Sequence, residues 1–297
     1  MRFFIYGLVI SCLVCTVHAL FLLRDGKIEH LFSSELSFLL LHPSYFSMYL
    51  VFALYFLLSE MQNRRLFFKS LRLSWLIVIF FSVFNFMLAS KMGWLCFIFI
   101  VGFLFCRQMV LLKKVKLLLA GILLFVVSAF SLYKFVPVAN EKINNLLAAF
   151  NEKNIDPATT ESSGVRVLIW KSASQVISGN FWWGVGSGKV KTELIKVYDE
   201  HGYTGASAKK LNAHNQFLEV FLALGFFGFL LFSAMLLLPL FVYNGKFPVH
   251  GLWFLIIVLI NFSVESMLQT QAGVVFFAFF YSVILIGKKS GKLTIKK

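Results

Sequence analysis

The stretch SGVRVLIW, residues 163–170, opens the longest polar segment of the chain, which ends with AHN at residues 213–215. A glycine cluster, GVGSG at residues 184–188, lies between these two ends. Long apolar runs precede and follow the segment. The chain is therefore organised as two groups of membrane segments on either side of one polar insertion.

The composition is that of a membrane protein. Of the 297 residues, 59% are hydrophobic and only 14% are charged, and the mean hydropathy is +0.83. A soluble domain carries about 25% charged residues. We therefore expect an all-α fold, a polytopic bundle of membrane helices.

The chain is strongly basic, with a net charge of +15. In a soluble protein that charge would suggest nucleic acid binding. Here most lysines and arginines lie in short connections and at the C-terminus, where such cations set membrane topology and contact anionic lipid. The predicted partner is therefore the lipid bilayer, with no nucleic acid.

Apolar runs of about 20 residues are needed to span a bilayer as helices. We predict about eight spans, over residues 3–23, 38–58 (interrupted at His42-Pro43), 73–89, 92–106, 117–136, 217–243, 252–264 and 273–287. This pattern divides the chain into an N-terminal membrane bundle of five spans (1–136), a large loop that carries the site (137–215) and a C-terminal bundle of three spans (216–297).

The basic residues of the short connections all fall on one side if the spans alternate. They are Arg64, Arg65, Lys69, Arg72, Arg107, Lys113, Lys114, Lys116, Lys288, Lys289, Lys292, Lys296 and Lys297. Positive charge marks the cytoplasmic side, so both termini are predicted to be cytoplasmic. The loop 137–215 then faces outward, together with Lys91, Glu265 and Gln269.

The large loop is predicted to contain helices of its own. Apolar residues recur at helical spacing in 142–150 and 165–176, and residues 189–200 form a third short helix before a break at 202–205. Ser162 or Ser163 is the expected N-cap of the second helix.

The four cysteines do not indicate redox or metal chemistry. Cys12 and Cys15 have C-x-x-C spacing, but they lie in an apolar run with no lysine or histidine beside them. No cluster of His, Cys, Asp and Glu has metal-ligand spacing in the sequence. We expect neither a metal nor a cofactor.

Three short motifs together resemble the O-antigen ligase and polymerase family. They are Gly-x-Arg-x-x-x-Trp at 164–170, Gly-x-Gly at 184–186, and His-Asn-x-x-Leu at 214–218 before a helix with Gly-x-x-Gly at 225–228. A fourth, Ser-Lys-x-x-Trp at 90–94, is similar to the family's Ser-Arg-x-x-Trp, with lysine in place of arginine.

The resemblance implies an inverting, metal-independent glycosyl transfer at the periplasmic face of a bacterial inner membrane. The donor would be a glycan on undecaprenyl diphosphate. Arg166 and Lys91 would bind the diphosphate, and His214 would take the proton from the acceptor hydroxyl. The residues expected to support them are Asn215, Trp170, Gly184, Gly186 and Glu265. Members usually have more spans before the loop, so the chain is either a reduced member or begins upstream of residue 1.

The family contains two reactions that share this donor. A ligase joins the glycan to lipid A core oligosaccharide, and a polymerase joins it to another repeat unit. We favour the ligase on the closeness of the motifs. A non-catalytic transporter of lipid-linked sugar is the alternative from a different class.

Each charged or ionisable candidate also has a plain structural interpretation. A neutral imidazole with a pKa near 6.5 suits a general base, but His214 is equally placed to cap a helix. The Arg166 fork matches a diphosphate, or it pairs with Glu161. Lys91 neutralises phosphate, or it snorkels beside Trp94.

The remaining candidates are open to the same choice. Gly184 and Gly186 belong either to a phosphate-binding nest or to a tight turn. Glu265 orients His214 or a sugar, or it lies in a solvated turn. Asn215 fixes either the imidazole ring or the start of the following helix.

Overall fold

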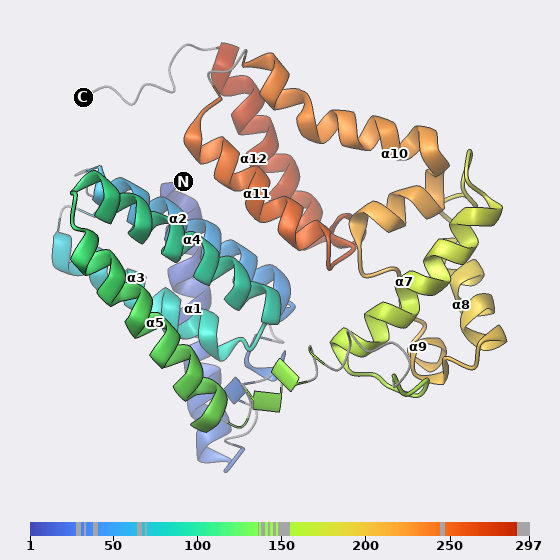
Figure 1. Cartoon of the computed structure of the whole chain (residues 1–297), viewed down its shortest axis with the longest axis horizontal. Coiled ribbons are helices and arrows are strands. Elements are labelled where there is room, and N and C mark those ends of the chain that lie inside the picture. Colours follow the sequence, from blue (N-terminus) through green and yellow to red (C-terminus); the bar gives the residue numbers. More distant parts are fainter. Residues whose placement is uncertain are drawn as a thin grey trace. The chain divides into compact units, whose positions relative to one another are not determined.

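The computed structural model describes residues 1–27, 31–32, 34–37, 41–63, 67–68, 70–135, 137, 140–141, 143–144, 147, 155–243 and 247–289. Within these ranges the chain is helical and contains no strand (Figure 1). The long helices are α1 (Arg2–Arg24), α2 (Pro43–Gln62), α3 (Leu71–Met87), α4 (Lys91–Leu111), α5 (Val115–Phe135), α7 (Ser162–Gly179), α10 (Gln216–Val242), α11 (Val249–Phe262) and α12 (Gln271–Lys289). The shorter ones are α8 (Val190–Glu200), α9 (Thr204–Ala208) and the 3-10 turns η2 (Ser34–Ser37) and η4 (Met267–Gln269).

Each predicted span corresponds to one apolar helix, α1 to α5 and α10 to α12. Helices α1, α2, α4 and α10 have both the length and the hydropathy to cross a membrane. Shorter apolar helical stretches lie in α3 (Leu71–Met87), α5 (Val115–Leu124), α11 (Val249–Phe262) and α12 (Gln271–Ile286). The prediction of a polytopic helical membrane protein is confirmed.

The predicted interruption of the second span at His42-Pro43 coincides with the start of helix α2, which begins at Pro43. Residues 38–40, the first residues of the predicted span, lie outside the described residues. His42 is the N-cap, and its Nδ1 accepts a hydrogen bond from the Ser44 amide at 3.4 Å. Proline suits the first position of a helix because its missing N–H has no helical partner there. The basic residues Arg64, Arg65, Lys69, Lys292, Lys296 and Lys297 lie outside the described residues.

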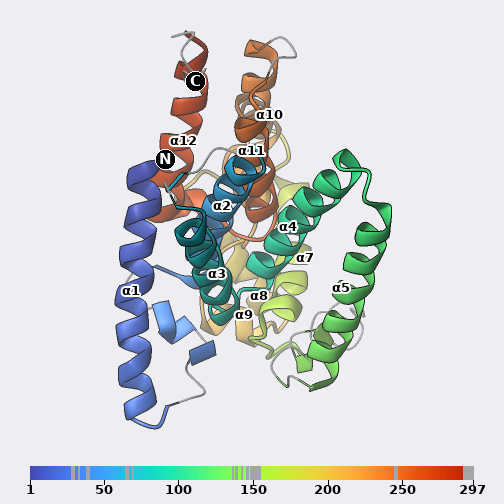
Figure 2. The same cartoon turned by 90° about the vertical axis from the view of Figure 1, so that its left-hand side faces the viewer.

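The chain forms two compact units that interleave in the sequence. The first contains residues 1–124 and 248–261, and the second contains residues 125–247 and 262–297. In the first unit α2 packs against α1, α3 and α4 (Figure 2). A buried hydrogen bond from Ser47 Oγ to Asn85 Oδ1, 2.5 Å long, joins α2 to α3.

The second unit is built on α7, whose predicted apolar stripe is buried. Val165, Ile169 and Ala173 pack with Leu194 and Tyr198 of α8 in one core. The N-cap of α7 is Glu161, so the prediction of Ser162 or Ser163 is wrong. The Glu161 carboxylate accepts hydrogen bonds from the amides of residues 163 and 164 at 2.8 and 3.0 Å. Its negative charge also complements the positive N-terminal end of the helix dipole.

The other predicted loop helices have mixed outcomes. Helix α8 confirms the predicted helix at 189–200, and Gly202, with φ +68°, follows its end. Helix α9 begins at Thr204, so the chain is helical again sooner than predicted. Most of the predicted helix at 142–150, including Leu146 and Phe150, lies outside the described residues.

Helix α10 is broken at Gly225, whose φ of 64° and ψ of −163° are not helical. Backbone groups of the loop between α7 and α8 form the hydrogen bonds that the helix lacks at the break. The amides of Val185 and Gly186 donate to the carbonyls of residues 222 and 223 at 2.8 and 2.9 Å, and the Phe226 amide donates to the Phe181 carbonyl at 2.8 Å. A Cβ on Gly225 would lie 2.3 Å from the Trp182 carbonyl oxygen. Only glycine therefore fits this contact.

Candidate functional site

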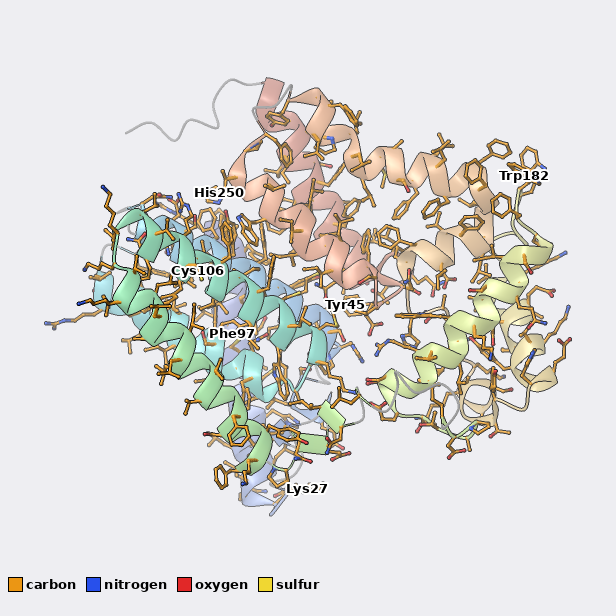
Figure 3. All side chains as sticks on the ribbon, viewed as in Figure 1. Lys27, Tyr45, Phe97, Cys106, Trp182 and His250 are labelled. Atoms are coloured by element: carbon orange, nitrogen blue, oxygen red, sulfur yellow. The ribbon has the colours of Figure 1, made fainter. Side chains whose placement is uncertain are left out.

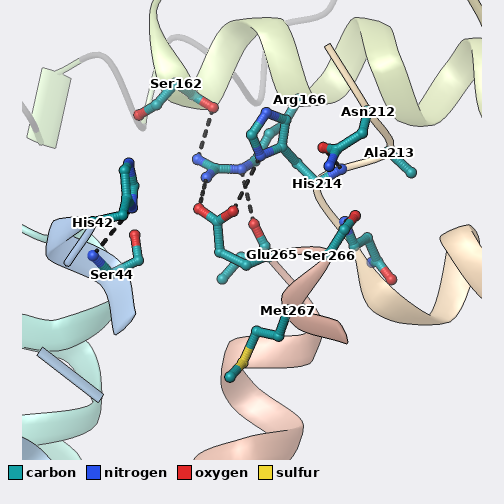
Figure 4. Close-up of polar contacts among 12 residues, drawn as sticks. His42, Ser44, Ser162, Arg166, Asn212, Ala213, His214, Glu265, Ser266 and Met267 are labelled. Atoms are coloured by element: carbon teal, nitrogen blue, oxygen red, sulfur yellow. Dashed lines mark hydrogen bonds and ion pairs between the residues drawn. The ribbon is translucent and has the colours of Figure 1, made fainter. Parts of the chain in front are cut away.

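Three segments of the second unit bring an arginine, a glutamate and a histidine together (Figure 4). Glu265 follows α11 in the sequence, Arg166 lies near the start of α7, and His214 lies just before α10. Glu265 Oε1 is 2.7 Å from Arg166 Nη2, and Glu265 Oε2 is 3.2 Å from His214 Nδ1. One carboxylate therefore bridges the cation and the imidazole that the sequence singled out.

The guanidinium of Arg166 is held on three sides. Its Nε donates to the Val264 carbonyl at 3.1 Å, and its Nη1 donates to the Ser162 carbonyl at 3.0 Å. The alternative in which it pairs with Glu161 is wrong, because its ion pair is with Glu265. A guanidinium has five N–H donors, so one on Nη1 and one on Nη2 remain available to a ligand. The Arg166 side chain is 19% exposed.

Trp170 and Asn215 hold the backbone on either side of His214. The Trp170 Nε1 donates to the Ala213 carbonyl at 3.1 Å. The Asn215 Oδ1 accepts the first amides of α10, those of residues 217 and 218, and its Nδ2 donates to the Ser263 carbonyl at 2.9 Å. His214 itself has φ 43°, a left-handed conformation that is strained for a side-chain-bearing residue. Asn215 thus caps the helix and leaves the ring to Glu265.

Glu265 determines which nitrogen of His214 carries the hydrogen in the neutral ring. An ionised carboxylate only accepts hydrogen bonds, so the Nδ1 that faces it must be the donor. The Nε2 then carries the lone pair. Nε2 forms no hydrogen bond with the part of the chain that the structure describes.

Glu219 is a further residue of the site that sequence analysis missed. Its buried carboxylate accepts hydrogen bonds from the Ala213 amide, from Ser266 Oγ and from Gln269 Nε2. It therefore ties the His214 segment to the chain that follows α11. The only signal in the sequence is an acidic residue in the first turn of an otherwise apolar span.

A pocket of about 320 Å³ lies beside His214. Glu219 and Gln269 line it, and so do two lysines, Lys191 and Lys210, that sequence analysis did not identify. Tyr198 lies nearby in the core, and burial raises the pKa of its phenol, which donates to the Leu211 carbonyl at 3.3 Å.

The glycine cluster forms a turn rather than an open nest. The Gly184 amide donates to the Asn180 carbonyl, and the next two amides bind the broken α10. These amides are therefore occupied and do not face a phosphate. The turn presents Trp182 (Figure 3) and Trp183, residues that are 56% and 77% exposed.

Lys91 is the first residue of α4 and belongs to the other compact unit. The Ser90 hydroxyl caps this helix by accepting the Gly93 amide at 3.2 Å. Trp94 stacks on Phe86, with ring centroids 5.1 Å apart. A contribution of Lys91 to the site in the second unit stays a prediction.

Within the described ranges, no group of three His, Cys, Asp or Glu side chains is placed so that it could hold a metal ion. All four cysteines are free thiols.

Fold and site together define a polytopic helical membrane protein with a polar Arg-Glu-His cluster beside its C-terminal spans. The profile of a family described as O-Antigen ligase matches residues 76–233, which is more than half of the chain. The chain belongs to the O-antigen ligase family. The match includes Lys91, Arg166 and His214, whereas Glu265 lies beyond it. Comparison with curated protein sequences gives no match.

Proposed function

We propose that the protein transfers a glycan from undecaprenyl diphosphate to the hydroxyl of an acceptor sugar, at the periplasmic face of a bacterial inner membrane. Membership of the O-antigen ligase family supports this class of reaction. The observation that carries the proposal is the Glu265 carboxylate, which contacts both Arg166 and His214.

His214 acts as the general base. Its Nε2 lone pair accepts the proton as the acceptor oxygen attacks the anomeric carbon of the donor. The bond between that carbon and the diphosphate oxygen breaks, and the configuration at the anomeric carbon inverts. Glu265 stabilises the imidazolium that forms, because the ring then carries a positive charge beside the carboxylate.

Arg166 binds the diphosphate leaving group through its two remaining N–H donors. A guanidinium fork matches phosphate oxygens, and charge-assisted bonds of this kind are stronger than neutral ones. This fixed cation stabilises the charge that develops on the leaving group.

The acceptor decides between ligase and polymerase. We propose lipid A core oligosaccharide as the acceptor, which makes the protein a ligase. Transfer to a second repeat unit would instead make it a polymerase that uses the same residues in the same roles.

A reconstituted transfer assay tests the proposal. Proteoliposomes would contain the purified protein, a labelled undecaprenyl diphosphate glycan and lipid A core acceptor. The wild type should form a new glycosidic bond, and His214→Ala should lower kcat by about 10²–10⁴-fold, the range of general base catalysis. Arg166→Ala should be similarly impaired, and Arg166→Lys should recover only part of the activity, because lysine keeps the charge without the fork.

His201→Ala and Lys171→Ala are matched controls, because both residues lie in the second unit and neither takes part in the Arg-Glu-His contacts. Both should keep wild-type activity. If the donor crosses the bilayer and no bond forms, the protein is a transporter and the proposal is wrong.

A further inference from the structure

The side chains that line the pocket beside His214 carry a net positive charge. Lys191 comes from α8 and Lys210 follows α9, and both line the pocket. In the described part of the chain neither ammonium group has an ion-pair partner. Lys196, on the same helix as Lys191, is instead paired with Glu193 at 2.8 Å. Two cations are therefore left to face the pocket.

The one carboxylate that lines the pocket is already satisfied. Glu219 is 6% exposed and accepts three hydrogen bonds from neutral donors. It contributes one negative charge against two positive ones. An anionic ligand is thus favoured over a neutral or cationic one.

The floor of the pocket is fixed before any ligand arrives. Asn212 Nδ2 donates to Gln269 Oε1 at 2.6 Å, and Asn212 Oδ1 accepts the His214 amide at 3.1 Å. Gln269 in turn donates to Glu219. The amide side chains of Asn212 and Gln269 are thus held in place, and the cationic side chains that remain for a ligand are the two lysines.

The pocket is distinct from the arginine side of the site. His214 lines it, whereas Arg166 does not, and His214 Nδ1 is already engaged by Glu265. A hydroxyl that loses its proton to His214 has to approach the other ring nitrogen. The pocket is therefore adjacent to His214 and separate from the arginine that would hold the donor diphosphate.

We propose that this pocket is the acceptor subsite and that Lys191 and Lys210 select acceptor glycans that carry a phosphate or carboxylate group. The proposal rests on the proposed function, because it assigns the acceptor of that reaction. The volume of the pocket, about 320 Å³, is within the range of small-ligand pockets.

The test compares two acceptors and two double variants. The acceptors are a synthetic oligosaccharide with one phosphate monoester and its dephosphorylated counterpart. Lys191→Gln/Lys210→Gln removes the two pocket charges. Lys196→Gln/Lys209→Gln removes the same charge from the same region, at residues that do not line the pocket.

The pocket variant should raise the KM for the phosphorylated acceptor roughly tenfold, as expected for two partly exposed ion pairs. Its KM for the donor and its kcat should stay at the wild-type values. The KM for the dephosphorylated acceptor should not change, and high salt should shrink the preference of the wild type. The control variant should behave as the wild type.

Other results would overturn the assignment. A raised KM for the donor would place the diphosphate, and not the acceptor, at the lysines. Equal KM values of the wild type for the two acceptors would show that the pocket does not distinguish acceptors by their charge. If the wild type transfers to neither, the proposed function fails, and calorimetric titration of both oligosaccharides into the solubilised protein still decides whether the pocket prefers the phosphorylated one.

Discussion

At the scale of single residues, Glu265 is the centre of the site. Its side chain is 10% exposed and contacts a guanidinium and an imidazole, one with each oxygen. A buried carboxylate without partners would be costly, and here two groups compensate its desolvation. Glu265 therefore positions His214 and Arg166 relative to each other.

Replacing Glu265 by glutamine should separate this positioning role from simple packing. The amide has nearly the same shape, but it is neutral and can donate to His214 Nδ1, which would move the hydrogen to Nε2 and remove the base. We expect kcat to fall on the order of 10²-fold with little change in the KM for the acceptor. Steady-state rates in proteoliposomes provide the measurement.

Glu193→Gln is the matched control, because that carboxylate forms an exposed ion pair on α8. It should leave kcat unchanged. A wild-type kcat in Glu265→Gln, with the protein folded, would remove Glu265 from the mechanism.

The sequence identified Arg166, His214 and Glu265 as candidates but did not show that they meet. Arg166 and Glu265 are separated by 99 positions, and no spacing rule reaches across that distance. Lys191 and Lys210 gave no signal at all, because a lysine in a polar loop is ordinary. Whether such a cation is paired depends on tertiary contacts alone.

At the scale of elements, the break in α10 separates a first part at the site from the apolar remainder of the helix. Hydropathy predicted one continuous span at 217–243, and helix α10 does cover those residues except the last. The break was not predictable from the sequence. Glycine in an apolar run is common, and the conformation of Gly225 depends on a turn about forty positions earlier.

Gly225→Ala should destabilise the second unit. Its backbone occupies a region that is essentially restricted to glycine, which costs about 1–3 kcal/mol for another residue. The added Cβ would also meet the Trp182 carbonyl. We expect a lower Tm in detergent, followed by tryptophan fluorescence, together with reduced transfer activity.

Gly188→Ala is the control for this change, because a Cβ at that position meets nothing within 4 Å and the backbone has no positive φ. It should keep the wild-type Tm. Equal melting of the two variants would mean that the Gly225 contact does not stabilise the protein.

At the scale of the whole molecule, the apolar periodicity predicted the helical class and the eight apolar helices, because burial in lipid leaves a strong compositional record. The two compact units follow a different division, since residues 248–261 group with the N-terminal helices. Such grouping reflects side-chain packing between distant segments, which hydropathy does not record. The division into two bundles and a loop stays a prediction about the membrane.

The predicted topology is testable by cysteine labelling. Cys12, Cys15, Cys96 and Cys106 would first be replaced, and single cysteines would then be placed at exposed positions. Lys209→Cys should react with an impermeant maleimide in intact spheroplasts, because the large loop is predicted to lie outside. Lys114→Cys should react only after the membrane is permeabilised. The reverse pattern would place the loop in the cytoplasm and end the periplasmic assignment of the site.

The interrupted helix also bears on how the protein matures. Carbonyl groups at the end of a helical turn lack donors of their own, and a medium without water offers none. Those of Leu222 and Ala223 are satisfied by Val185 and Gly186, which the ribosome makes first. The chain segment that supplies the donors is therefore synthesised before the carbonyls that need them.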